Sequence, residues 1–318
     1  MWQPTWRYSA AGQTGITTTV ATRAVVVNQH NGIFAWTRKT GQPPGQNARW
    51  TQPGELFAMA QLIKERLAAG EMVRVMTVGA FATPKLVEAA GRLANIHGIW
   101  FDQEHCALTH GQLELLALAA RAAGVDCFSR VAPTDYATVM RPMEAGCSGV
   151  MAAQVCTAEQ VQQIVAWAKF APQGGRGTYT SNAECDYGDV GIADHVARAN
   201  QQRWIAIQIE TREAVENVAD IAAVEGVDWL FVGPSDLSVN LHVPGDYLHP
   251  TCVDALKKVA DAVGAVGKPW GALCPTPEHA EQCRELGCQV FSLHSDSGCF
   301  RAGIRRLEEE FAQFMGKS

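Results

Sequence analysis

The 318-residue sequence predicts an α/β fold: a TIM (β/α)8 barrel with an N-terminal extension. From residue 72 onward, short apolar segments alternate with amphipathic helical segments. Alternating βα units build parallel sheets with right-handed crossovers. Eight such units fit the usual barrel length of about 250 residues. An open doubly wound sheet is the alternative, but no GxGxxG motif follows an early strand.

The clearest βα unit lies in the middle of the chain. Residues 204–209 form an apolar run broken only by Gln208, which is typical of a strand buried on both faces. Apolar residues then recur at helical spacing over 211–224, after a threonine that suits an N-cap. A second apolar strand follows at 229–232. This strand–helix–strand pattern is the unit that we extend to the rest of the chain.

The same patterns recur on both sides of this unit. Apolar runs predict eight strands, at 72–78, 99–101, 127–131, 149–155, 204–209, 229–232, 269–273 and 289–293. Helical spacing predicts helices over 56–67, 83–94, 110–123, 134–145, 157–170, 192–201, 211–224, 251–264, 277–286 and 299–315. Several of them open with Thr-Pro or a single threonine, residues that favour the start of a helix.

The first part of the chain has a different composition. Residues 1–54 are rich in Thr, Gln, Gly and Pro, and only the short apolar run at 24–27 suggests a strand, at the edge of a sheet. We therefore predict two parts: an extension over 1–54, and a barrel domain over 55–318. The extension is expected either to be poorly ordered or to pack against a neighbouring molecule.

Composition excludes several classes of partner. The net charge is −6 with no basic run, so neither nucleic acid nor an anionic membrane is expected as a partner. No apolar stretch is long enough for a membrane span, and the N-terminus lacks a signal-peptide pattern. The ten cysteines form no CxxC pair and no disulfide framework. These observations predict a cytoplasmic protein.

Two acids follow neighbouring strands of the central unit. Glu210 ends the strand at 204–209, and Asp236 follows the strand at 229–232. Adjacent parallel strands lie about 4.8 Å apart, so both carboxylates can reach one hard divalent cation. In the alternative interpretation, Glu210 caps a helix and Asp236 lies in a turn.

Two further strand ends carry polar residues. Asp102 to His105 follow the second strand, and Arg130 ends the third. Functional groups of TIM barrels lie at these carboxyl ends, so an acid pair, a cation and a base are expected to share one site. In the alternative interpretation, His105 caps the next helix and Arg130 makes a structural ion pair.

In this order, these motifs resemble the HpcH/HpaI aldolase/citrate lyase family. Within it they resemble the metal-dependent (class II) pyruvate aldolases of the 4-hydroxy-2-oxo-heptanedioate aldolase type. The resemblance covers about residues 57–315. Its motifs are KERLAAGE at 64–71, FDQEH at 101–105, SRV at 129–131, PQGGRG at 172–177, QIETREAVEN at 208–217, EGVDWLFVGPSDLS at 225–238 and HP at 249–250.

The resemblance implies metal and catalytic roles. Glu210 and Asp236 correspond to the ligands of Mg²⁺ or Mn²⁺, with Co²⁺ or Zn²⁺ as alternatives. Arg130 corresponds to the arginine that faces the 2-oxo acid. His105 corresponds to the general base, acting directly or through a metal-bound water. Glu144 occupies the place of an aspartate that pairs with this histidine.

Other positions are expected around the substrate. Gln208, and the backbone at Gly233, Pro234 and Ser235, correspond to groups that hold the substrate. The remaining candidates are supporting or alternative ones: Asp102 and Glu104 near the metal, Arg176 on a substrate carboxylate or in a loop salt bridge, and His294 and Asp296 after the eighth strand. The fourth strand ends in Ala-Gln at 153–154, unlike many relatives, which alters a wall near the substrate.

The implied reaction is reversible aldol cleavage of a 4-hydroxy-2-oxo acid to pyruvate and an aldehyde through a metal-stabilised pyruvate enolate. The enolate charge requires a Lewis acid or a cation where it develops. No lysine lies at a predicted strand's carboxyl end, so a Schiff base is not expected. Oxaloacetate decarboxylation, macrophomate-synthase-like chemistry and a non-catalytic metabolite-binding barrel are the alternatives.

The terminal helix bears on assembly. An apolar stripe runs along 299–315, with Phe300, Ile304, Leu307, Phe311 and Phe314. Such a stripe suits docking on a partner. Together with the resemblance, it predicts a homo-oligomer, either a hexamer or a trimer of dimers.

Overall fold

The computed structural model describes residues 24–28, 32–36 and 62–315. The chain divides into two units, Met1–Leu56 and Phe57–Ser318. The predicted boundary between residues 54 and 55 lies outside the described residues, as does the start of the helix predicted over 56–67.

The first unit contains a β-hairpin. Strand β1 (Ala24–Asn28) pairs antiparallel with β2 (Gly32–Trp36), with Val26 opposite Phe34. The predicted strand at 24–27 is confirmed, whereas β2 was not predicted.

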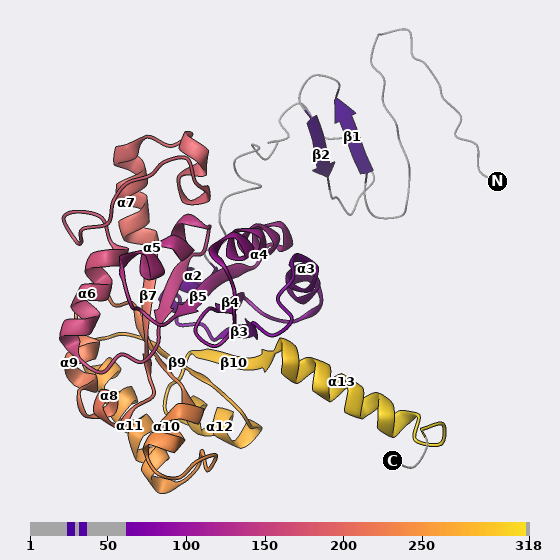
Figure 1. Ribbon diagram of the computed structural model, residues 1–318, viewed down its shortest axis with the longest axis vertical. Helices are drawn as coiled ribbons and strands as arrows, with labels where there is room; N and C mark the ends of the chain where they lie inside the picture. The colour runs from indigo at the N-terminus through magenta and orange to yellow at the C-terminus, as the bar shows by residue number, and fades with distance from the viewer. Residues whose placement is uncertain (1–23, 29–31, 37–61, 316–318) are drawn as a thin grey trace. The chain divides into compact units, whose positions relative to one another are not determined.

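The second unit is a closed barrel of eight parallel strands, which confirms the predicted fold (Figure 1). The strands follow one another around the barrel in the order β10-β3-β4-β5-β6-β7-β8-β9. Their bounds are β3 Val73–Val78, β4 Gly98–Asp102, β5 Asp126–Val131, β6 Gly149–Ala152, β7 Trp204–Ile209, β8 Trp229–Val232, β9 Trp270–Leu273 and β10 Val290–Ser295.

A helix follows every barrel strand, and one more precedes the first. Most of these helices form the outer layer, whereas the last one projects from the barrel (Figure 1). They are α2 Leu62–Ala68, α3 Pro84–Leu93, α4 His110–Ala123, α5 Tyr136–Glu144, α6 Ala158–Ala168, the 3₁₀ helix η1 Ala183–Gly188, α7 Ile192–Gln202, α8 Arg212–Glu216, α9 Val218–Ala223, α10 Pro234–Asn240, α11 Pro250–Ala265, α12 Pro277–Glu285 and α13 Asp296–Glu310. Within the described part of the chain, no helix is both long and apolar enough to cross a membrane.

Three predicted elements differ from the structure. The helix predicted over 211–224 is two helices, because Asn217 leaves helical geometry and donates its side chain to the Cys156 carbonyl. The segment after β8, where the alternative interpretation has a turn, opens helix α10. Strand β6 ends before the predicted residue 155, because Gln154 adopts a positive φ of 56°.

Aromatic side chains fill the barrel interior. Trp204 and Trp229 lie with ring centroids 5.1 Å apart, and Phe128 meets Trp204 edge to face at 4.8 Å. Gly149 makes room for this packing, since a Cβ there would lie 2.2 Å from the Trp204 ring. The filled interior leaves the carboxyl ends of the strands as the place for a site.

The amino end of the barrel is closed by α2. Its Ile63 is fully buried against the interior cluster, and its backbone N–H donates to Asp126 of β5. Burial raises the pKa of Asp126 to about 7, although hydrogen bonds from Ser148 and the Ile63 amide oppose this. This end of the barrel is therefore structural.

Candidate active site

The site begins with an ion pair between two neighbouring strand ends. Asp102 and Arg130 are register partners on β4 and β5. Arg130 donates to both oxygens of Asp102, at 3.2 and 2.7 Å, and its Nε lies 3.2 Å from Glu104 Oε2. The guanidinium also stacks over the Trp100 ring, 4.7 Å from its centroid. Arg130 is thus fixed in position before any ligand binds.

The two acids around Arg130 differ in ionisation. Burial alone would raise the pKa of Asp102, but the hydrogen bonds and charge of Arg130 lower it overall. Burial raises the pKa of Glu104 more than Arg130 lowers it, and nearby Asp102 and Asp236 raise it further. Asp102 is therefore the firmly ionised partner of Arg130, and Glu104 lies closer to the group of acids across the site.

Glu210 at the end of β7 is fully buried and held in one orientation. Its Oε1 accepts the backbone N–H of Gln154 at 2.8 Å and the Gln154 side chain at 3.0 Å, and its Oε2 accepts the side chain of Gln208. Burial raises its pKa to about 7, and the charges of Glu104 and Asp236 add to this rise. A cation bound at this carboxylate would favour its ionised form and so oppose both the burial and the repulsion from Glu104 and Asp236.

The segment after β8 completes this part of the site. Asp236 lies in the first turn of α10, half-buried, and Gly233 precedes that helix. A Cβ at Gly233 would lie 2.6 Å from Gln208 Nε2 and 2.6 Å from Glu210 Oε2, so only glycine allows this close approach. Pro234 is buried at the helix start, while Ser235 is exposed.

These residues fit a divalent cation. Their side chains offer carboxylate oxygens from three strand ends: Glu104, Glu210 and Asp236. Hard cations such as Mg²⁺ and Mn²⁺ prefer such ligands. Among the described residues, the buried Glu104 Oε2 and Gln208 Oε1 accept no hydrogen bond. The predicted ligands, the buried Glu210 and the half-buried Asp236, make no ion pair within the described residues.

His105 lies at the rim of this site. Its side chain is 59% exposed, and its Nε2 is 3.7 Å from Glu104 Oε2. Asp102 Oδ1 accepts the backbone N–H groups of Glu104 and His105, which shapes the turn after β4. The imidazole is therefore held near the acids but remains accessible to a ligand.

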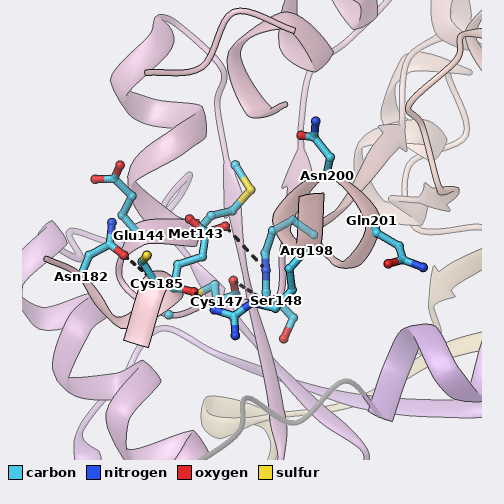
Figure 2. Close-up of polar contacts among 12 residues, drawn as sticks. Met143, Glu144, Cys147, Ser148, Asn182, Cys185, Arg198, Asn200 and Gln201 are labelled. Carbon is cyan, nitrogen blue, oxygen red and sulfur yellow. Dashed lines mark hydrogen bonds and ion pairs between the residues drawn. The ribbon is translucent and has the colours of Figure 1, made fainter. Parts of the chain in front are cut away.

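Glu144 does not join this site within one chain. Helix α5 returns the chain from the carboxyl end of β5 to the amino end of β6, and Glu144 is its last residue. Its carboxylate lies 3.8 Å from Arg176, and Figure 2 shows it close to Asn182 and Cys185. Because this is the opposite end of the barrel from His105, we omit Glu144 from the catalytic set.

Arg176 makes a buried structural ion pair, in agreement with the salt-bridge interpretation. Its guanidinium binds both oxygens of Glu184, which also lies 3.6 Å from Arg203. All three side chains are at least 95% buried. Burial opposes ionisation of Glu184, but the charge and hydrogen bonds of Arg176 lower its pKa overall. This cluster ties the loop after α6 to η1 and α7.

Gln154 is the site residue that sequence reasoning missed. It was noted only as part of an unusual strand end. Its backbone N–H and its side chain nevertheless donate two of the three hydrogen bonds that the Glu210 carboxylate accepts. Its positive φ of 56° directs its N–H and side chain toward the same oxygen. The only sequence signal for Gln154 was that the fourth predicted strand ends differently from that of many relatives.

The residues at the end of β10 have different roles. Asp296 accepts the backbone N–H groups of Gly79 and Phe81, at 3.0 and 2.7 Å, and so fixes the loop after β3. His294 lines a cavity of about 470 Å³ at the carboxyl ends of β9 and β10. Ser292, also in its lining, accepts a hydrogen bond from Trp100 Nε1, so the cavity adjoins the ring beneath Arg130.

The fold and these strand ends define a (β/α)8-barrel enzyme with an acid-rich site. The profile of the HpcH/HpaI aldolase/citrate lyase family matches residues 108–302, and the chain belongs to that family. It is a carbon–carbon lyase of the class II aldolase type. Divalent-metal dependence is general to this group.

Individual relatives agree with this assignment. The chain is 31% identical over 243 residues to 5-keto-4-deoxy-D-glucarate aldolase of Escherichia coli strain E24377A, which covers 76% of this chain and 94% of the relative. The crystal structure of an HpcH/HpaI aldolase from Desulfitobacterium hafniense DCB-2 superposes with a TM-score of 0.73 at 30% identity, covering 78% and 97% of the two chains. Citrate synthase SbnG gives 0.72 at 25%, covering 80% and 98%.

Proposed function

We propose that this protein catalyses the reversible aldol cleavage of a 4-hydroxy-2-oxo acid to pyruvate and an aldehyde. The observation that carries the proposal is the buried Glu210, whose pKa is raised to about 7 beside Glu104 and Asp236. Such a carboxylate is poised to exchange its proton for a metal ion. The fixed Arg130 lies across the same strand ends and supplies the second positive group.

Glu210 and Asp236 would hold the divalent ion, with Gln154 and Gln208 keeping the Glu210 carboxylate in place. When bound, the ion would supply Lewis-acid stabilisation of the negative charge that develops on the keto oxygen as the carbon–carbon bond breaks. Replacing a residue that hydrogen-bonds to a metal ligand commonly weakens metal affinity by about 10- to 100-fold. We expect an effect of this size for Gln154.

Arg130 would bind the oxygens of the 2-oxo acid. Its planar guanidinium retains its charge throughout turnover and can present parallel donors to a carboxylate. Asp102 and Trp100 hold it, so little rearrangement is needed when the substrate arrives. A fixed cation of this kind favours the additional negative charge that develops on the keto oxygen during cleavage.

His105 would remove the proton from the 4-hydroxyl group during cleavage and return it during condensation. Imidazole is suited to proton transfer near neutral pH. The side chain is exposed at the rim, where the 4-hydroxyl of a substrate anchored at Arg130 would emerge. The cavity lined by His294 and Arg301 offers room for the polar aldehyde portion beyond that group.

We further propose a homo-oligomer assembled through α13. This helix projects from the barrel (Figure 1), and of its residues only Asp296 is buried. The predicted apolar stripe is exposed, with Phe300 57%, Leu307 52% and Phe314 74% accessible. Light scattering should show an oligomer that Leu307→Asp dissociates, while exposed Arg305→Asp leaves it intact. A monomeric wild-type protein would contradict the assembly.

The function is tested by pyruvate release coupled to lactate dehydrogenase. The substrate panel consists of 4-hydroxy-2-oxo acids and includes 5-keto-4-deoxy-D-glucarate, the substrate in the name of the Escherichia coli relative. Release should require Mg²⁺ or Mn²⁺, stop with EDTA, and disappear in Glu210→Ala and His105→Ala. Glu213→Ala, which removes an exposed acid from the next helix, is the matched control. Release that survives both EDTA and Glu210→Ala would refute the metal site. Pyruvate and CO₂ formed from added oxaloacetate, with no release from the panel, would indicate decarboxylation.

A further inference from the structure

A second cluster of metal-ligating side chains lies outside the catalytic site. Cys274 follows β9, while His279 and Cys283 lie one turn apart on α12. Their ligand atoms all lie within 4.8 Å of one another, and all three residues are buried. The two ring nitrogens of His279 are 3.8 and 3.9 Å from Cys283 Sγ.

Packing alone does not account for this histidine. His279 is 1% exposed, and in the described part of the chain its ring nitrogens have only thiols as hydrogen-bonding partners, those of Cys283 and Cys274. A thiol is a weak donor and a weak acceptor, so the buried imidazole is poorly satisfied. Elsewhere in the barrel, buried Cys127 and Cys147 lie 4.0 Å apart as an ordinary pair. The cluster differs from that pair by the imidazole directed at its thiols.

A further cysteine follows the cluster in the chain. Cys288 is buried in the loop between α12 and β10. Its thiol donates to the backbone carbonyl of Val290, the first residue of β10, at 3.4 Å. The spacing is Cys274-x4-His279-x3-Cys283-x4-Cys288. Three thiols and one imidazole form a ligand set typical of structural zinc sites.

We propose that Cys274, His279 and Cys283, with Cys288 as fourth ligand, bind one thiophilic divalent cation of the zinc type. Thiolate and imidazole ligands favour Zn²⁺ over the hard cations that suit the carboxylates of the catalytic site. Four protein ligands leave no open position, so the ion is structural and fastens α12 to the ends of β9 and β10.

The cysteine and histidine side chains of this cluster can take up a metal ion from solvent. Each coordinating thiol gives its proton to solvent as the sulfur–metal bond forms, so binding releases up to three protons per ion. Cys274 lines the cavity of about 470 Å³, which provides a route from solvent.

The test measures tightly bound zinc in the full-length protein. The protein is produced with added zinc and dialysed against EDTA until the weakly held catalytic metal is removed, then analysed by plasma mass spectrometry. We expect one zinc ion per chain in the wild type and in Glu210→Ala. We expect its loss in His279→Ala and in Cys274→Ser. Cys127→Ser, a buried thiol outside the cluster, is the matched control and should retain the ion.

Spectroscopy on the wild type keeps the test independent of whether the variants fold. Cobalt-substituted protein should show thiolate-to-cobalt charge transfer and strong visible bands of a tetrahedral site, which an all-oxygen site does not give. X-ray absorption at the zinc edge should show a sulfur-dominated shell at about 2.3 Å. A zinc-free wild type, or zinc that is surrounded by oxygen alone and lost in Glu210→Ala, would overturn the proposal.

Discussion

Replacing Glu210 by glutamine should stabilise the metal-free protein at the cost of activity. A glutamine can keep the bonds from Gln154 at its oxygen. Its new N–H₂ group can donate to the Gln208 amide oxygen after that amide rotates, and this oxygen is otherwise an unsatisfied buried acceptor in the described part of the chain. Glu210→Gln therefore removes a buried charge and leaves the surrounding hydrogen bonds satisfied.

The magnitude follows from the pKa of Glu210, about 7 in the folded protein against an ordinary 4.5. Between these values the folded state retains a proton that the unfolded state has lost, so the stability of the wild type falls as pH rises through this window. Each tenfold change in ionisation is worth about 1.4 kcal/mol, so the full penalty above pH 7 is about 3 kcal/mol. The variant carries none of it.

Urea unfolding in EDTA, followed by tryptophan fluorescence, measures the difference. The two proteins should be nearly equal at pH 4.5, and the variant should be more stable by about 3 kcal/mol at pH 8. Asp126, whose pKa is also about 7, is unchanged and cancels in the comparison. Added Mn²⁺ should stabilise the wild type but not the variant. A variant that is equally or less stable at pH 8 would refute the reasoning.

Three further outcomes follow from single contacts. Gln154→Ala should weaken Mn²⁺ binding by about 10- to 100-fold in calorimetry, because Glu210 loses the hydrogen bond from the Gln154 side chain, and unchanged affinity would contradict this. Arg130→Lys should lower kcat/KM for pyruvate-forming cleavage by about 10²-fold, since an ammonium cannot match the planar donors; near-normal kinetics would remove Arg130 from the substrate. Glu184→Ala should destabilise the protein by about 3–5 kcal/mol, because it leaves Arg176 and Arg203 buried without their acid, and a loss below about 1 kcal/mol would contradict this.

Local patterns predicted the barrel well because its strands are short, apolar and buried on both faces. The strand at 204–209 begins and ends where predicted, and so does the helix at 110–123. Errors arose where a distant contact decides local structure. Asn217 breaks a helix by bonding to a carbonyl 61 residues earlier in the chain, which sequence periodicity does not register.

In the candidate site, too, local patterns predicted well and distant contacts caused errors. Strand-end position was enough to bring Asp102, Arg130 and Glu210 to one face of the barrel, because parallel strands share a carboxyl edge. Gln154 escaped notice because its role depends on a left-handed backbone and on an acid 56 residues away. Glu144 was misplaced because it was assigned from the resemblance alone, although the last turn of a helix that follows a barrel strand lies at the amino end of the barrel.

The central claim is that the site forms a pyruvate enolate with the help of a divalent ion. Exchange of the pyruvate methyl protons with deuterium, followed by proton NMR in D₂O, tests it without knowledge of the aldehyde. Exchange should proceed with Mg²⁺, cease with EDTA, be lost in Glu210→Ala and persist in Glu213→Ala. Exchange that continues without metal, or in Glu210→Ala, would contradict the account.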